Sequence, residues 1–192
     1  MKKILSVFIL ALCFPFPAHA QDDKADLKEM LAVINSSLGD VTLYEPNDVP
    51  VENRNQFDFN NDGTAEWVIV PKTACGDTNN CTYFIMQKDK KGKWFILHKG
   101  DGKITSLSPW GIIITPRKTN GYFDFITVFD QGPEGNGTRS LEQTVYTWEG
   151  KKYEKYTGTY PPPGSPPELS GLMTEINKLK YERGRGNKPV VQ

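Results

Sequence analysis

The sequence predicts an α+β fold, in which an antiparallel β-meander of about seven to eight strands is flanked by an N-terminal helix and a C-terminal helix. Three observations support this prediction. Short apolar and aromatic segments alternate with turn-forming residues through the centre of the chain, which is typical of sheets built from local hairpins. An amphipathic segment precedes this region, and a second one follows it after a run of prolines.

The first 20 residues are expected to be a signal peptide, residues 1–20, that is removed before the protein folds. Lys2 and Lys3 precede an uncharged apolar run that is shorter than the roughly 20 residues needed to span a bilayer. Small residues before Gln21 favour cleavage between Ala20 and Gln21. The mature chain is therefore expected in the periplasm or secreted, and no later segment is long and apolar enough to be a transmembrane segment.

The segment 22–37 is predicted to form the N-terminal helix. Its apolar residues recur on one face of a 3.6-residue period, and Gly39 is placed to end the helix. The segment 41–44 is a short strand candidate, and 45–50 is expected to be a polar loop. The apolar face consists of Leu27, Met30, Leu31, Ile34 and Leu38.

Predicted strands fill the rest of a globular domain that spans residues 21–160. Asn120-Gly121 is a strong signal for a two-residue hairpin turn, and 90–93 and 149–151 also have turn composition. Such local connections favour a meander. The glycine-rich segment 130–139 is expected to be a longer loop. The predicted strands are 67–70, 82–87, 94–98, 104–107, 111–115, 122–129, 141–148 and 152–160.

The C-terminal part of the chain has three predicted segments. Prolines make 161–167 a stiff, extended linker, and 183–192 is a basic tail that is expected to be disordered. Between them, 168–182 is predicted to form a helix that either docks on the sheet or is released by the linker to bind a partner. Its apolar face consists of Leu169, Leu172, Met173, Ile176 and Leu179.

Charge and cysteine content narrow the function. Loss of Lys2 and Lys3 with the signal reduces the 23 basic residues of the chain to 21, against 23 acidic ones. This near-neutral charge argues against a nucleic-acid partner, which would need a basic face. Cys75 and Cys81 then remain as an even pair that brackets a turn-rich stretch. An oxidising compartment favours a disulfide between them, with two free thiols as the alternative.

The segment 58–66 fits the pattern D-x-N-x-D-G-x-x-E, which can wrap hard oxygen ligands around calcium. The twelfth position, a bidentate glutamate in an EF-hand, is Ile69 here, and a strand-like stretch follows the loop. The sequence therefore predicts a loop-to-strand site of weak affinity, about 10⁻⁴ to 10⁻³ M. The alternative is a plain Asn/Asp-Gly turn. The candidate ligands are Asp58, Asn60, Asp62, the Thr64 carbonyl and Glu66.

The stretch DFNNDGTAEWVIV, residues 58–70, resembles one repeat of the FG-GAP/VCBS type, the loop-plus-strand unit of integrin-alpha-like β-propellers. The family pattern, D-x-[DN]-x-D-G-x-x-[DE] before an apolar strand, is matched by Asp58, Asn60, Asp62, Gly63 and Glu66. The resemblance implies structural calcium held by these side chains, Gly63 excepted, and by the carbonyl of residue 64. No second copy is present, so a multi-bladed propeller is not expected. The order of the later turn and cysteine motifs is similar to that of small exported bacterial proteins.

Catalytic side chains are sparse. His98, the only histidine outside the signal, is interpreted as a surface or edge-strand residue. The short motifs of serine hydrolases, zinc proteases and nucleotide-binding enzymes are absent from the sequence. Carboxylate-only glycosidases leave no such motif, and Asp124 and Asp130 could meet across strands, although charges on a solvated face would explain them as well.

Three functions stay open, and the sequence does not predict the oligomeric state. The first is an exported non-catalytic binding protein of the bacterial envelope, such as an inhibitor or immunity-type partner of a wall-acting enzyme. The second is a carboxylate-dependent hydrolase acting on an envelope glycan or polymer. The third is a purely structural calcium-binding protein. The first is favoured, because export, a disulfide and long loops occur without a recognisable catalytic group.

Overall fold

The computed structural model describes residues 22–39, 43–76, 80–103, 111–133, 139–165 and 167–181. Within them, eight strands form two antiparallel sheets of four, and two α-helices flank the sheets. The predicted α+β fold is therefore confirmed. The predicted signal peptide with its Ala20–Gln21 cleavage site, the strand candidate 104–107 and the tail 183–192 lie outside the described residues.

Each sheet follows the order of the chain, β1-β2-β3-β4 in one and β5-β6-β7-β8 in the other. The meander thus divides after β4, which the sequence did not reveal. It also did not reveal β1, a short edge strand with three polar residues. Leu43 and Tyr44, part of a predicted strand, lie in an irregular segment. The strands are β1 (Arg54–Phe57), β2 (Glu66–Ile69), β3 (Asn80–Lys88), β4 (Trp94–Lys103), β5 (Ile113–Thr119), β6 (Tyr122–Pro133), β7 (Arg139–Trp148) and β8 (Tyr153–Lys155).

The predicted hairpin turns are confirmed. Asn120 and Gly121 have φ values of 50° and 89°, as a two-residue turn between twisted strands requires. In the β3–β4 turn, the Asp89 carboxylate accepts hydrogen bonds from the N–H groups of Lys91 and Lys93, at 2.8 and 2.9 Å. These turns bind their own backbone groups, so their shape is set by a few neighbouring residues.

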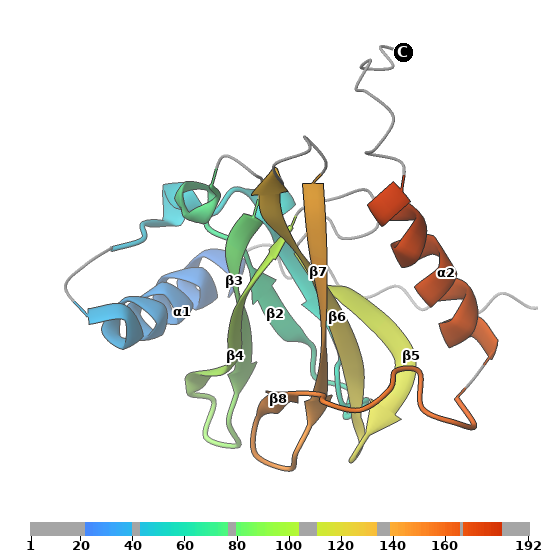
Figure 1. Ribbon diagram of the computed structural model, residues 1–192. Coiled ribbons are helices and arrows are strands. Elements are labelled where there is room, and N and C mark those ends of the chain that lie inside the picture. Colours follow the sequence, from blue (N-terminus) through green and yellow to red (C-terminus); the bar gives the residue numbers. More distant parts are fainter. Residues whose placement is uncertain are drawn as a thin grey trace, which may run out of the picture.

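The molecule is built in four layers, in the order α1, β1–β4 sheet, β5–β8 sheet and α2 (Figure 1). Helix α1 (Asp22–Leu38) buries its predicted apolar face against side chains of β2, β3 and β4. Helix α2 (Pro167–Tyr181) buries Leu169 and Ile176, and Ile176 packs with apolar side chains of β5, β6 and β7. The C-terminal helix is therefore docked on the sheet rather than released.

The proline-rich segment before α2 contains a turn instead of the expected extended linker. Ser165 donates hydrogen bonds to the Pro162 carbonyl from its N–H, at 3.2 Å, and from its hydroxyl, at 2.7 Å. Gly164 has a φ of 81°, which a residue without a side chain adopts freely. This glycine lets the chain bend within the proline run and brings α2 back to the sheet.

His98 lies on β4, an edge strand of its sheet, as one of the two alternatives had it, but the interpretation of His98 as a surface residue is wrong. Trp94 and Ile96 face α1, and strict alternation would send His98 to the same side. Instead, Ile85 pairs with His98 while Met86 pairs with Ile96, so a bulge at Leu97 reverses the alternation. The His98 ring lies between the sheets, 4.6 Å from the Tyr146 ring, and its Nε2 atom is buried without a hydrogen-bond partner among the described residues.

The predicted disulfide between Cys75 and Cys81 is present, with an S–S distance of 2.04 Å. It anchors the start of β3, where Asn80 reaches the other sheet. The Asn80 side chain accepts a hydrogen bond from the Asp130 N–H at 2.9 Å and donates one to the Asp130 carbonyl at 2.8 Å. The cross-link therefore supports a contact between β3 and β6.

An ion pair joins the two sheets beside this contact. Lys103 Nζ of β4 lies 2.5 Å from Asp130 Oδ2 of β6, and the two side chains are 2% and 0% exposed. Charges removed from water in this way are stable only while both partners are present.

Asp130→Asn is expected to lower the free energy of unfolding by about 3 to 5 kcal/mol, because it removes the carboxylate charge that faces the buried Lys103 ammonium. Urea denaturation measures the loss. As a control, Lys152→Ala breaks the exposed pair with Glu154 and is expected to cost less than about 1 kcal/mol. Equal, small losses in the two variants would contradict the buried placement.

His98 is expected to make stability depend on pH. Burial lowers its pKa from 6.5 to about 4. As pH falls through this interval the unfolded chain takes up the proton first, so stability present above 6.5 is lost toward 4. His98→Phe should remove about 2 kcal/mol of the decrease seen between about pH 7 and about pH 4.5 in urea denaturation. A decrease as large as that of the wild type would place His98 in solvent.

Candidate functional site

Four hairpin turns lie at one end of the two sheets, at the lower edge of Figure 1. In an antiparallel meander, every second connection lies at the same end of the sheet, which places the β1–β2 and β3–β4 turns together and likewise the β5–β6 and β7–β8 turns. The Phe123 N–H donates to the Phe59 carbonyl at 2.7 Å and so brings the two sets together. We call residues 58–65, 89–93, 118–121 and 149–152 the hairpin end.

Tyr122 contacts several elements at the base of the hairpin end. Its hydroxyl accepts hydrogen bonds from Asn60 Nδ2 at 3.2 Å and from Gln87 Nε2 at 3.5 Å. Its ring stacks on Trp148, with the ring centroids 4.2 Å apart. One side chain thus contacts the β1–β2 loop, the end of β3 and the end of β7.

The β1–β2 loop brings three predicted ligands together. The Asp62 N–H donates to Asp58 Oδ1 at 3.1 Å and to Asn60 Oδ1 at 2.8 Å. The Gly63 N–H donates to Asp58 Oδ2 at 2.9 Å, and Asn60 Nδ2 donates to Asp62 Oδ2 at 2.9 Å. Gly63 has a φ of 87°, which explains the glycine at the sharpest point of the loop. Thr64 is exposed, and its N–H donates to Asp62 Oδ1.

Glu66 lies behind the loop and is only 1% exposed. Its Oε2 accepts a hydrogen bond from the Phe59 N–H at 2.8 Å, and its Oε1 accepts one from Gln87 Nε2 at 2.7 Å. Burial raises the pKa of this carboxyl to about 7, against the lowering effect of backbone hydrogen bonds, and the charges of Asp62 and Asp58 raise it further. Negative charge is therefore crowded around this loop.

Within the described ranges, no group of three or more His, Cys, Asp or Glu side chains is placed to hold a metal ion. Glu66 therefore does not complete a three-carboxylate site with Asp58 and Asp62 in this arrangement. The oxygen donors that calcium would use in this loop are the mixed set of Asp58, Asn60 and Asp62. In the contacts above, each carboxylate oxygen of Asp58 and Asp62 accepts only one hydrogen bond from the loop. A carboxylate oxygen can accept a second partner, so each of these oxygens can also bind a cation.

Asp124 and Asp130, the candidate pair of catalytic carboxylates, do not meet. Asp124 and Asp130 both lie on β6, six residues or about 20 Å apart along the strand. Both are buried rather than solvated, and each has its own cation, Arg117 for Asp124 and Lys103 for Asp130. Burial raises the pKa of Asp124, while Thr119 and Arg117 oppose the rise.

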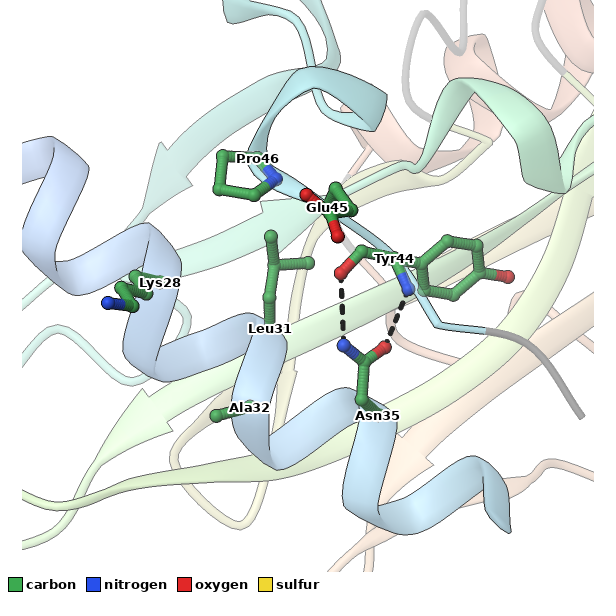
Figure 2. A pocket seen from close by; sticks show the side chains of 7 residues that line it. All are labelled: Lys28, Leu31, Ala32, Asn35, Tyr44, Glu45 and Pro46. Atoms are coloured by element: carbon green, nitrogen blue, oxygen red, sulfur yellow. Dashed lines mark hydrogen bonds between the residues drawn. The ribbon is translucent and has the colours of Figure 1, made fainter. Parts of the chain in front are cut away.

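A pocket of about 270 Å³ lies outside the hairpin end, between α1 and the segment 44–46. In Figure 2, Lys28, Leu31 and Asn35 line it from the helix, opposite Tyr44 and Pro46. The Asn35 amide is already paired with the N–H and carbonyl of Tyr44, at 2.8 and 2.9 Å. The pocket therefore offers a ligand few free polar groups.

Sequence reasoning found the loop but missed the residues that hold it in place. The sequence predicts Gln87 and Tyr122 only as parts of strands, because nothing in their immediate sequence surroundings distinguishes them from other strand residues. They act on Glu66 and Asn60 through contacts between residues 21 and 62 positions apart.

No family model, no curated protein and no solved structure matches this chain. The likeness to an FG-GAP/VCBS repeat therefore stays a prediction from the loop residues alone. Among the described residues, no helix is long and apolar enough to cross a membrane.

Tyr122→Phe is expected to lower the free energy of unfolding by about 1 kcal/mol, because Asn60 and Gln87 each lose an acceptor while the stacking on Trp148 remains. Chemical denaturation monitored by tryptophan fluorescence measures it. Tyr156→Phe is the control, since the Tyr156 hydroxyl has no hydrogen bond within the described part of the chain, and it should cost less than about 0.5 kcal/mol. Equal losses of stability in the two variants would argue against the hydrogen bonds from Asn60 and Gln87 to the Tyr122 hydroxyl.

Proposed function

We propose that this protein is an exported, non-catalytic binding protein of the bacterial envelope that carries calcium in its β1–β2 loop. The observation that supports the proposal best is the arrangement of Asp58, Asn60 and Asp62, whose side-chain oxygens gather around the loop backbone. Export is supported by the signal-like sequence of residues 1–20 and by the Cys75–Cys81 disulfide, which persists in oxidising compartments.

Electrostatics favour a cation at this loop. Two aspartates stand at the surface, next to a buried glutamate whose pKa they help to raise. A divalent cation would neutralise the aspartates and relieve this repulsion. In the proposed site, Asp58, Asn60 and Asp62 bind calcium through side-chain oxygens and Thr64 through its carbonyl. Glu66 would become a further ligand by exchanging one of its two hydrogen bonds for the ion.

The role proposed for calcium is structural. The loop adjoins the contact between the Phe123 N–H and the Phe59 carbonyl and the bond between Asn60 and Tyr122, so its order is tied to the packing of the two sheets. The bound partner would be an envelope protein, for example a wall-acting enzyme that this protein inhibits.

Calcium is expected to raise the melting temperature and to release or absorb measurable heat on titration. With a dissociation constant of about 10⁻⁴ to 10⁻³ M, about 10 mM calcium would add about 1.4 to 2.7 kcal/mol of stability. Asp62→Asn should abolish most of the effect, because it removes a charged ligand.

Asp89→Asn is the matched control. Asp89 also accepts backbone hydrogen bonds within a turn, and the substitution changes the charge equally, but it stands outside the β1–β2 loop. It should retain the full response to calcium. A wild-type protein with no heat and no shift in melting temperature in 10 mM calcium, on the order of ten times the weakest expected constant, would refute the calcium site.

The partner is tested separately, with the exported protein as bait in periplasmic extract. A binding protein should retain the same envelope protein in repeated experiments. Purified bait and partner should then form a complex by gel filtration. Repeated failure to retain any protein would contradict the binding function and leave a purely structural calcium protein.

A further inference from the structure

We propose that the hairpin end is a docking surface for an anionic lipid membrane, whose headgroup phosphates it contacts through lysines on three turns. The enhancement by calcium that is described below rests on the proposed calcium loop, whereas the lysine surface does not.

The lysines are brought together by the fold, not by sequence. Lys90, Lys91 and Lys93 lie on the β3–β4 turn, Lys118 enters the β5–β6 turn, and Lys151 and Lys152 lie on the β7–β8 turn. All are exposed except Lys118, which is half-buried with its Nζ 4.2 Å from the Phe123 ring. Contacts of Tyr122 with Gln87 and Trp148 hold the bases of these hairpins side by side.

The charge of this end differs from that of the whole chain. Its six lysines face four carboxylates, Asp58, Asp62, Asp89 and Glu149, which leaves a net charge of +2, or +1 when Glu154, the ion-pair partner of Lys152, is counted as well, on a chain whose formal net charge is zero. Two of the four carboxylates belong to the β1–β2 loop. A calcium ion there would raise the net charge of the hairpin end from +2 to +4.

The chemistry of the turns favours a broad layer of phosphates over a single bound chain. The positive charges are lysine ammonium groups on flexible stems, which act as point charges rather than as the planar forks of arginine. They come from separate turns, and the pocket in Figure 2 is lined by none of them. A flat array of headgroups can meet all three turns at once.

The turn tips carry no large apolar side chain. Their sequences are Asn61-Asp62-Gly63-Thr64, Lys90-Lys91-Gly92, Thr119-Asn120-Gly121 and Glu149-Gly150-Lys151. Binding would therefore be electrostatic, without insertion into the hydrocarbon, and would weaken as salt screens the charges. Calcium would add a direct attraction, since it takes six to eight oxygen ligands and the loop offers four or five, so that phosphate oxygens can complete the set.

The test is cosedimentation of the exported protein with vesicles of phosphatidylcholine alone or with about 30% phosphatidylglycerol. We expect binding to the anionic vesicles only, at least a 10-fold loss of affinity between about 50 and about 300 mM salt, and stronger binding with calcium than with magnesium. Binding to neither vesicle, or equally to both, would overturn the proposal.

Two triple variants separate the surface from general charge. Lys90, Lys91 and Lys151, each replaced by Gln, should reduce affinity for anionic vesicles about 10- to 100-fold. Lys24, Lys28 and Lys72, each replaced by Gln, remove the same charge from exposed positions outside the hairpin end and should retain wild-type binding. Equal losses of vesicle affinity in the two variants would show that the membrane does not bind at the hairpin end and would overturn the proposal.

Two further measurements keep the proposals distinct. Calcium titration without vesicles reports on the loop alone, so normal calcium binding together with no vesicle binding would reject the membrane surface and keep the proposed function. If soluble polyphosphate binds the hairpin end while anionic vesicles do not, the partner is an anionic polymer and the lipid assignment is wrong.

Discussion

Strand β6 is connected to the opposite sheet near both of its ends by hydrogen bonds and an ion pair, and the two-sheet arrangement depends on these polar contacts. At one end, the Phe123 N–H donates to the Phe59 carbonyl and Tyr122 accepts a hydrogen bond from Asn60. At the other, Asp130 is bonded to Asn80 and paired with Lys103. Apolar burial alone is non-directional and would tolerate sliding of one sheet over the other. These polar contacts satisfy buried groups in only one register, so sliding would leave them unpaired.

Between these two sets of polar contacts lies a layer of aromatic side chains, which packs well in the register that the polar contacts require. Phe125 stacks on Tyr146 with ring centroids 5.0 Å apart and meets the edges of the His98 and Tyr153 rings at 5.2 and 4.8 Å. His98 enters this layer only because of the bulge at Leu97. The buried imidazole is held neutral at pH 7, since its pKa is lowered to about 4. Within the part of the chain that the structure describes, the His98 Nε2 atom has no hydrogen-bond partner, so this histidine contributes to packing.

The same architecture concentrates the polar chemistry at the hairpin end. Two meanders packed face to face place four turns at one end, while the disulfide and the Lys103–Asp130 pair secure the other. The hairpin end therefore combines an acidic loop with lysines from three turns, and Glu66, a buried glutamate with a raised pKa, lies directly behind the loop. The proposed calcium and membrane contacts both follow from this combination. Each requires residues far apart in the chain to be held together by a rigid pair of sheets.

Several features could be predicted because each is encoded within a few neighbouring residues. The helical period of 22–37, the Asn120-Gly121 turn, the Cys75–Cys81 pairing and the loop with Asp58, Asn60 and Asp62 are all of this local kind. Other features were decided by the tertiary structure: the division into two sheets, the inward turn of His98, the hydrogen bond of Gln87 to Glu66 and the burial of Lys103 with Asp130. A bulge of one residue reverses which face of the sheet a side chain occupies, and packing between distant strands decides the partner of a buried charge. Neither feature can therefore be predicted from a local sequence pattern.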